Sequence, residues 1–157
     1  MLVVSAALNL QLATALAQVT TITNPTPAVG ACFGRSVAAL GTDRLLIGAY
    51  QDDVGASRAG AAYLVTTNGV LLTTFTNPTP ESYDNFGYSV TAVGTDQVLI
   101  GAYQDNTGWT NSGAAYLFST NGVLLTTFTN PTPAPSDNFG YSIAAVGTDR
   151  AGVNLFL

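Results

Sequence analysis

A 53-residue repeat occupies most of this 157-residue chain and limits what the chain can fold into. Phe33-Gly34 recurs as Phe86-Gly87 and as Phe139-Gly140, and 37 of the 53 residues in 33–85 are identical in 86–138. Units so similar in sequence are expected to adopt the same local structure and to bury a core by packing against their neighbours.

Turn signals divide each unit into four short strands. Gly41-Thr42-Asp43 ends the first strand, Asn68-Gly69 marks a tight hairpin, and the Asn-Pro-Thr-Pro run at 77–80 ends the fourth strand, because proline donates no ladder hydrogen bond. The predicted strands are Ser36–Leu40, Leu45–Tyr50, Ala61–Val65 and Val70–Thr76, then Ser89–Val93, Val98–Tyr103, Ala114–Phe118 and Val123–Thr129. Four antiparallel strands per unit is the anatomy of a propeller blade.

The sequence therefore predicts an all-β fold of β-propeller-type blades, with about two and a half units in the chain. Leu45–Tyr50 is apolar throughout instead of alternating, as expected of a strand that stacked blades cover on both faces. Stacking also explains why only 8% of the residues are charged. A two-layer sandwich of eight strands is the alternative, but it would not require a 53-residue period.

The composition argues against several classes of function. The formal net charge is -5, with four Arg and no Lys, whereas a nucleic-acid partner needs basic side chains for its phosphates. The chain has no His, so it offers no imidazole base and no His metal ligand. Cys32 is the single Cys, which permits no internal disulfide, and we interpret it as a small apolar filler.

Two short motifs resemble the FG-GAP repeat. They are Phe-Gly-x-Ser-Val at 33–37 and Ile-Gly-Ala-Tyr at 47–50, and Gly60–Leu64 resembles the third strand of that family. The resemblance covers residues 18–150 and departs from the family at Tyr50 and Tyr103, where FG-GAP units carry proline. It implies a seven-bladed propeller like the head of integrin α chains, used in adhesion and ligand binding. The repeat is also similar to those of large secreted bacterial proteins.

The resemblance does not extend to calcium binding. Integrin-type repeats hold calcium in an Asp-rich loop between strands one and two. Here that connection is only Gly41-Thr42-Asp43 and its counterparts, and one carboxylate cannot supply the six or more oxygens that calcium prefers. We therefore expect no cofactor.

The loops that follow the second strand of each unit, residues 51–59 and 104–112, form the candidate ligand rim. Asp52, Asp53, Asp105 and Asn106 open these loops and are candidate contacts for a cation or another ligand, although Asx turns explain the same residues. Trp109 stands where the sister loop has Ala56. Its ring could anchor a partner, stack on a sugar or cover a blade edge.

Two further pairs of polar residues precede Phe-Gly. Asp84-Asn85 and Asp137-Asn138 are interpreted as turn residues between blades. Nothing in the chain predicts a catalytic residue.

The ends of the chain depart from the repeat. Residues 1–17 are apolar and end in Ala15-Leu16-Ala17, which predicts a signal peptide without its basic region; an amphipathic helix or an extra strand is the alternative. This stretch is too short and too interrupted for a membrane span. Residues 18–32 are a partial repeat with one outer strand of a blade, and residues 139–157 are a truncated third unit.

Two complete blades, 33–85 and 86–138, are too few to close a ring. We therefore expect a fragment of a larger propeller, a frameshifted product or one part of an oligomer. Uncharged strand edges such as Val70–Thr76 predict self-association.

Together these features predict a non-catalytic, secreted or cell-surface propeller protein for adhesion, interaction or scaffolding, with a protein or glycan ligand. The alternatives are a carbohydrate- or cation-binding module that uses the rim loops, and an accessory domain of an extracellular hydrolase.

Overall fold

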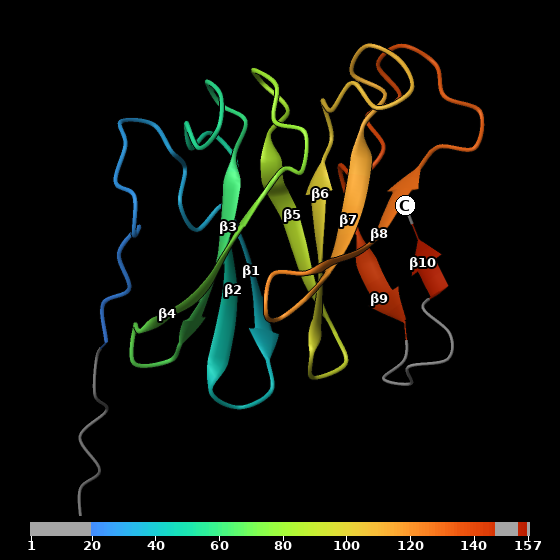
Figure 1. The fold of residues 1–157 in the computed structure, drawn as a ribbon. Helices are drawn as coiled ribbons and strands as arrows, with labels where there is room; N and C mark the ends of the chain where they lie inside the picture. Colours follow the sequence, from blue (N-terminus) through green and yellow to red (C-terminus); the bar gives the residue numbers. More distant parts are fainter. Residues whose placement is uncertain (1–19, 147–153, 157) are drawn as a thin grey trace, which may run out of the picture.

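The computed structural model describes residues 20–146 and 154–156, which form ten strands and no helix (Figure 1). The strands make two four-stranded antiparallel sheets and one two-stranded sheet. Each four-stranded sheet is a meander in which every strand pairs with the next one along the chain. The predicted all-β fold of propeller-like blades is confirmed.

Each complete repeat unit forms one sheet. The first blade contains β1 (Ser36–Leu40), β2 (Arg44–Ala49), β3 (Ala61–Thr66) and β4 (Leu71–Thr76). The second contains β5 (Phe86–Val93), β6 (Gln97–Ala102), β7 (Ala114–Ser119) and β8 (Leu124–Thr129), and β9 (Ala144–Val146) pairs with β10 (Asn154–Phe156). Most of the predicted bounds lie within one residue of these. The exception is β5, which begins at Phe86 and not at Ser89, because Phe86 pairs with Ala102 across a β-bulge.

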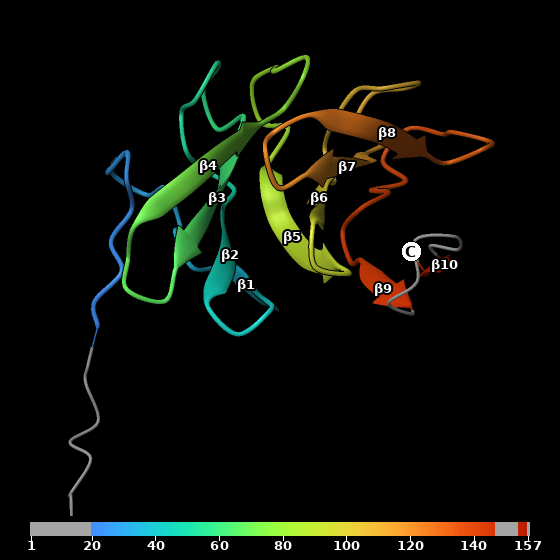
Figure 2. The same cartoon turned by 60° about the horizontal axis from the view of Figure 1, so that its bottom comes forward.

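The two blades stack face to face. In Figure 2 the inner strands β1, β5 and β9 lie along one side of the molecule, and the outer strands β4 and β8 lie along the opposite side. One cluster of buried side chains from both sheets fills the space between the blades, and β5 packs against β1 and β2. Its largest members are Leu40, Leu46, Leu64, Phe75, Phe86, Val90, Val98, Ile100, Tyr116 and Phe118.

Close backbone contact between the blades explains why Phe-Gly and Gly-Ala recur together. A Cβ atom at Gly48 in β2 would overlap the carbonyl oxygen of Gly87 in β5. Gly101 in β6 has the same relation to the carbonyl oxygen of Gly140. A side chain at either position would push neighbouring units apart, so the stacking distance requires glycine there.

The segment before the first blade differs from expectation. Residues 20–32 contain bends and turns but no strand, so the outer strand predicted within 18–32 is not formed by the described part of that range. An outer strand needs the third strand of its own blade beside it, and none of the described strands pairs with this segment. Ile22 and Phe33 pack instead against a buried cluster of the first blade that includes Ile47 and Tyr63. The predicted signal peptide, residues 1–17, lies outside the described residues.

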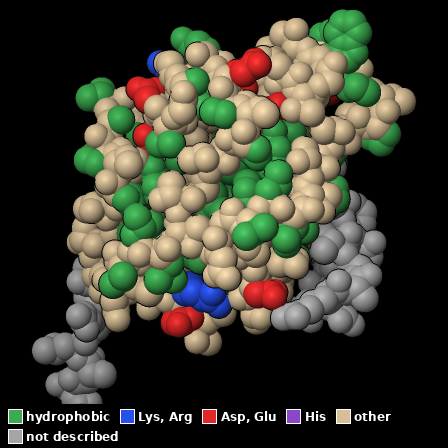
Figure 3. Space-filling view, viewed as in Figure 1, with side chains coloured by type: hydrophobic (Ala, Val, Ile, Leu, Met, Phe, Trp, Pro, Cys, Tyr) green, Lys and Arg blue, Asp and Glu red, His purple; other side chains and the backbone are tan. Residues whose placement is uncertain are grey.

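The outer strands expose apolar side chains. In Figure 3 hydrophobic side chains gather over the middle of the face on which β4 and β8 lie, and acidic ones appear at the upper and lower ends. Leu71 and Leu72 in β4 are 43% and 48% exposed, and Leu124 and Leu125 in β8 are 39% and 44% exposed. Such a surface on edge strands favours association, and self-association stays a prediction.

Candidate functional site

The candidate site is one end of the stacked blades, which we call the loop rim. It consists of the β2–β3 loop (residues 50–60), the β6–β7 loop (103–113), the β4–β5 linker (77–85) and the segment between β8 and β9 (130–143). All four lie at the upper end of the molecule in Figure 1. Successive blades run in the same orientation, so loops at equivalent positions of the repeat project from the same end.

Asp52 and Asp105 lie beneath the rim and not on it. They are 2% and 3% exposed. Asp52 Oδ2 accepts hydrogen bonds from Thr26 Oγ1 at 2.7 Å, Tyr63 OH at 2.7 Å and Asn24 Nδ2 at 3.4 Å. These partners come from the segment before the first blade and from β3, so the carboxylate ties that segment to the sheet.

Asp105 makes the equivalent connection in the second blade. Its Oδ2 accepts hydrogen bonds from Asn77 Nδ2 at 2.8 Å and from Tyr116 OH at 2.5 Å, and its Oδ1 caps the backbone N–H of Thr107 at 2.8 Å. Burial, and then the hydrogen bond to Asp105, raises the pKa of Tyr116, so the phenol remains a proton donor. Both carboxylate oxygens of Asp105 accept hydrogen bonds, and they tie the β4–β5 linker, β7 and the β6–β7 loop together.

Asp53 and Asn106 are exposed and shape the loops. Asp53 Oδ1 accepts the backbone N–H of Arg58 at 2.8 Å, and Asn106 Oδ1 accepts that of Asn111 at 2.9 Å. Arg58 and Asn111 both have left-handed backbone angles, with φ of 52° and 53°. Each side chain thus bridges its loop to a residue five positions along the chain and holds that left-handed residue in place.

Trp109 stands out from the rim, 57% exposed. Its backbone N–H donates to Ser112 Oγ at 3.2 Å, which fixes the loop beneath the ring. The β6–β7 loop carries Asp105, Asn106 and Trp109. The equivalent β2–β3 loop of the first blade carries Asp52 and Asp53. A polar cavity of about 220 Å³ lies beside the second loop and is lined by Thr79, Glu81, Asp105, Asn106 and Thr107.

Asp84 does more than form a turn, because its carboxylate is buried and hydrogen-bonded beneath the loop rim. It is 1% exposed, and its Oδ2 accepts Asn77 Nδ2 and the backbone N–H of Glu81, both at 2.7 Å. Asn77 thus joins Asp84 to Asp105 through one amide. The sequence does indicate that Asn77 has a structural role, since Asn24, Asn77 and Asn130 follow the 53-residue period. Nothing in the residues around Asn77, however, indicates that its partner Asp105 lies 28 residues away.

Sequence reasoning also missed a row of aromatic rings contributed by β5 and by three segments of the loop rim. Tyr88 contacts Tyr50, Tyr103 and Tyr141, with ring centroids 5.1, 4.5 and 4.8 Å apart. The guanidinium of Arg35 lies 4.6 Å from the Tyr88 centroid, a cation–π contact. Arg35, Tyr88 and Tyr141 occupy one position of the repeat, and Tyr50 and Tyr103 occupy another. The period could have shown that these side chains line up along the stack.

The described part of the chain contains no group of three or more Asp, Glu, Cys or His side chains placed to hold a metal ion. Its buried carboxylates Asp52, Asp84 and Asp105 each accept hydrogen bonds from hydroxyl, amide or backbone N–H donors. The loop rim therefore presents exposed aromatic rings, and buried hydrogen bonds hold the loops that carry them in a fixed shape.

Comparison with known families agrees with the blade anatomy. Residues 16–65 and 73–118 each match the model of the FG-GAP repeat. No curated protein matches the chain. The two matched segments together cover more than half of the sequence, and the chain belongs to the FG-GAP repeat family.

Proposed function

We propose that this chain is a secreted or cell-surface interaction module that binds a protein ligand through the loop rim. One observation carries the proposal: three aromatic side chains of the rim are more than half exposed. They are Tyr83 at 54%, Trp109 at 57% and Tyr141 at 53%. Exposed Tyr and Trp are enriched where proteins bind partners, because each supplies a large rigid surface with a polar edge.

The structure beneath these rings supports binding by a preformed surface. The Asp52 and Asp105 tethers hold the loops, and Asp53 and Asn106 fix their turns. A loop that is already ordered loses little conformational entropy when a partner binds. FG-GAP repeats are found in integrin-like β-propeller proteins, in which they are interaction modules and not catalytic ones.

Export is the second part of the proposal. FG-GAP repeats occur in extracellular or surface proteins. The apolar segment 1–17 ends in Ala15-Leu16-Ala17, a small-x-small pattern that suits cleavage before Gln18. Among the residues that the structure describes, no helix is long and apolar enough to span a membrane. Expression of the full chain in a bacterial host, with mass spectrometry of the periplasmic product, should find Gln18 as the first residue; uncleaved protein retained in the cytoplasm would contradict export.

Binding is tested on plates coated with fibronectin or collagen. We expect the chain to be retained on at least one coat, and Trp109→Ala with Tyr83→Ala should weaken retention about tenfold or more. Val123→Ala is the matched control, because Val123 is 60% exposed but lies in the hairpin at the opposite end of the second blade. Retention on none of the coats, or equal loss in the control, would contradict the proposal.

Glycan binding is the second candidate function, and the polar cavity formed by the β4–β5 linker and the first residues of the loop that carries Trp109 favours it. Hydroxyl and carboxylate groups of Thr79 and Glu81, from the linker, and hydroxyl and amide groups of Thr107 and Asn106, from the loop, line about 220 Å³. Sugars are recognised by such groups together with an aromatic ring. Retention of the chain by a glycan array, lost in Trp109→Ala and not competed by the protein coats, would favour this function over the first.

A further inference from the structure

Four tyrosine side chains meet where successive repeat units stack, and we call them the tyrosine row: Tyr50, Tyr88, Tyr103 and Tyr141. Tyr88 in β5 lies at the centre of the row. Its ring centroid is 4.5 Å from that of Tyr103 and 4.8 Å from that of Tyr141. On the side of the first blade, the centroid of Tyr50 lies 5.1 Å away. Tyr88 therefore has a tyrosine neighbour from the unit before it and from the unit after it.

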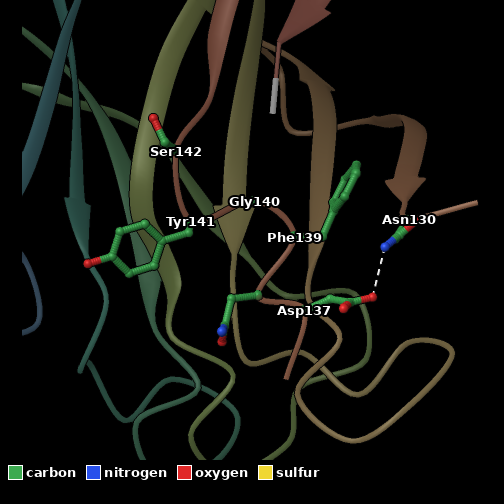
Figure 4. Close-up of a pocket in the computed structure, with 7 residues that line it drawn as sticks. Asn130, Asp137, Phe139, Gly140, Tyr141 and Ser142 are labelled. Atoms are coloured by element: carbon green, nitrogen blue, oxygen red, sulfur yellow. Dashed lines mark hydrogen bonds between the residues drawn. The ribbon is translucent and has the colours of Figure 1, made fainter. Parts of the chain in front are cut away.

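The hydroxyl groups of Tyr88 and Tyr141 are in direct contact. Tyr88 OH donates a hydrogen bond to Tyr141 OH, with the oxygens 2.9 Å apart and the ring planes inclined by 40°. Tyr141 lines the cavity drawn in Figure 4, where its ring points away from Phe139 and carries the hydroxyl at its far end. Each ortho carbon of a tyrosine is bonded to the carbon that bears the hydroxyl. Two hydroxyls in hydrogen-bond contact therefore bring the ortho edges of the two rings close together.

The other ring pairs of the row are arranged differently. Tyr50 meets Tyr88 edge to face, with the ring planes at 83°. Tyr103 meets Tyr141 in the same way, at 84°. An edge-to-face pair directs the edge of one ring at the face of the other, so the two ortho edges do not lie beside each other. The ring of Tyr103 is the nearest to Tyr88 but is inclined to it by 56°. Of the contacts within this row, Tyr88 with Tyr141 is the one in which a hydrogen bond joins the hydroxyls.

The surroundings of this pair favour the loss of hydrogen atoms from its phenols. The hydrogen bond with Tyr88 raises the pKa of Tyr141, so this phenol carries its proton at neutral pH and is oxidised by losing a hydrogen atom. Tyr141 is 53% exposed and lies within reach of an oxidant in solution. Arg35 Nη2 donates to Tyr88 OH at 3.0 Å, so the proton of Tyr88 is directed at the oxygen of Tyr141. A radical formed on Tyr141 can therefore be passed to Tyr88 along this hydrogen bond.

We propose that Tyr88 and Tyr141 form a site of oxidative cross-linking, at which a haem peroxidase and hydrogen peroxide join the two rings as dityrosine. The peroxidase removes one hydrogen atom from each phenol, and the two radicals form a carbon–carbon bond between their ortho carbons. The two ortho hydrogens then move to the phenolic oxygens, which restores both aromatic rings. The two hydrogen atoms removed reduce one hydrogen peroxide to two waters. The inference goes beyond the proposed function, since the cross-link forms whether or not the loop rim binds a ligand.

The cross-link would tie one repeat unit to the next. Tyr88 and Tyr141 occupy the same position in successive units, 53 residues apart. Because the rings already touch, the new bond requires little movement of the folded chain. It restricts the unfolded chain much more, since it closes a long loop. The thermal unfolding midpoint should therefore rise by about 10 °C on cross-linking.

The test treats the full chain with hydrogen peroxide and a haem peroxidase and isolates the monomer by size exclusion. Digestion with a protease that cleaves before Asp then separates the members of the tyrosine row, which lie in the peptides 43–51, 84–95, 96–104 and 137–148. Mass spectrometry should find peptide 84–95 joined to peptide 137–148, at their summed mass less two hydrogens. This product should exceed every other cross-linked pair and should show dityrosine fluorescence.

A matched pair of variants tests the orientation argument. Tyr141→Phe keeps the ring and removes the hydroxyl that Tyr88 contacts, so it should abolish this product and the rise in the unfolding midpoint. Tyr50→Phe makes the same change in a ring that also contacts Tyr88, but edge to face. It should leave the yield of the product and the rise in the midpoint unchanged.

Three results would overturn the proposal. The first is a monomer that contains no cross-linked peptides after treatment. The second is a larger yield of another product, such as peptide 84–95 joined to 96–104, or of dityrosine that joins separate chains. The third is an equal loss of the product in both variants, because the edge-to-face ring would then be as important as the hydrogen-bonded one.

Discussion

Replacement of Asp84 by asparagine should flatten the dependence of the protein's stability on pH. Asp84 is 1% exposed, and its Oδ1 is buried without a hydrogen-bond partner among the described residues. Burial raises the pKa of this carboxyl from its ordinary 3.8 to about 6, and the charges of Asp105 and Glu81 add to the effect. The hydrogen bonds from the Glu81 N–H and from Asn77 act in the opposite direction.

The sign follows from proton binding. Between pH 3.8 and about 6 the folded protein holds a proton on Asp84 that the unfolded chain has released. Stability therefore falls as the pH rises through this window, and the full benefit of the proton is present only below pH 3.8. A rise in pKa of about two units corresponds to about 3 kcal/mol of unfolding free energy between the two limits.

Urea unfolding followed by circular dichroism at several pH values between 4 and 8 measures this difference. The other carboxyl groups also titrate, so the quantity to compare is wild type minus Asp84→Asn. It should change by about 2.5 kcal/mol from pH 4 to pH 8, in the direction that favours the variant at high pH. Because the new amide places a buried NH₂ without a partner, the net gain of the variant at pH 8 should be smaller, about 1 kcal/mol.

Asp137→Asn is the matched control. It makes the same change at the equivalent position of the next unit, where the carboxylate is exposed. This variant should keep the wild-type profile between pH 4 and 8. An Asp84→Asn profile that runs parallel to the wild type would refute the reasoning, since it would mean that Asp84 is no more desolvated in the folded protein than in the unfolded chain.

Three further predictions concern packing and surface. Gly48→Ala should cost about 3 kcal/mol or more in thermal unfolding, because the added methyl group overlaps the Gly87 carbonyl oxygen between the blades; an unchanged midpoint would contradict this packing. Phe86→Ala should cost about 3–5 kcal/mol by urea unfolding, because Phe86 is fully buried in the core between the sheets, and a loss below about 1 kcal/mol would contradict that burial. Leu72→Lys with Leu125→Lys should reduce light scattering of concentrated protein and leave the unfolding midpoint within about 2 °C; scattering equal to the wild type would show that association does not use the outer strands.

The positions of the strands could be predicted from the sequence because the turn and strand signals are local and occur in both repeat units. β1 runs over the predicted Ser36–Leu40, and the hairpin at Asn68-Gly69 forms where glycine supplies a φ of 83°. Strand pairing within a meander needs no information beyond neighbouring turns. The same reasoning failed for residues 20–32, since an outer strand depends on a neighbour that no local signal reveals.

The candidate site was less predictable because its contacts are long-range. Asp105 looked like a loop residue, and it does cap Thr107, but its burial comes from Asn77 and Tyr116. The spacing of residues in the sequence does not show which side of the β4–β5 linker Asp105 will lie against, or that the amide of Asn77 will donate to it. Exposure also depends on neighbouring units: Asp84 and Asp137 stand at one repeat position, yet the first is buried and the second exposed.

Differences between the two copies are most frequent in the rim loops, whereas the exposed leucines of β4 and β8 are identical. Residues 53–59 and 106–112 differ at six of seven positions, and the exception, Gly55 with Gly108, has φ of 87° and 101°, which a side chain would strain. The buried tethers are unchanged between the copies, Asp52 with Asp105 and Tyr63 with Tyr116. Duplication alone would scatter the differences evenly along the unit. Their concentration in the loops means that the fold tolerates different side chains on a constant base, which is the property that an interaction surface requires.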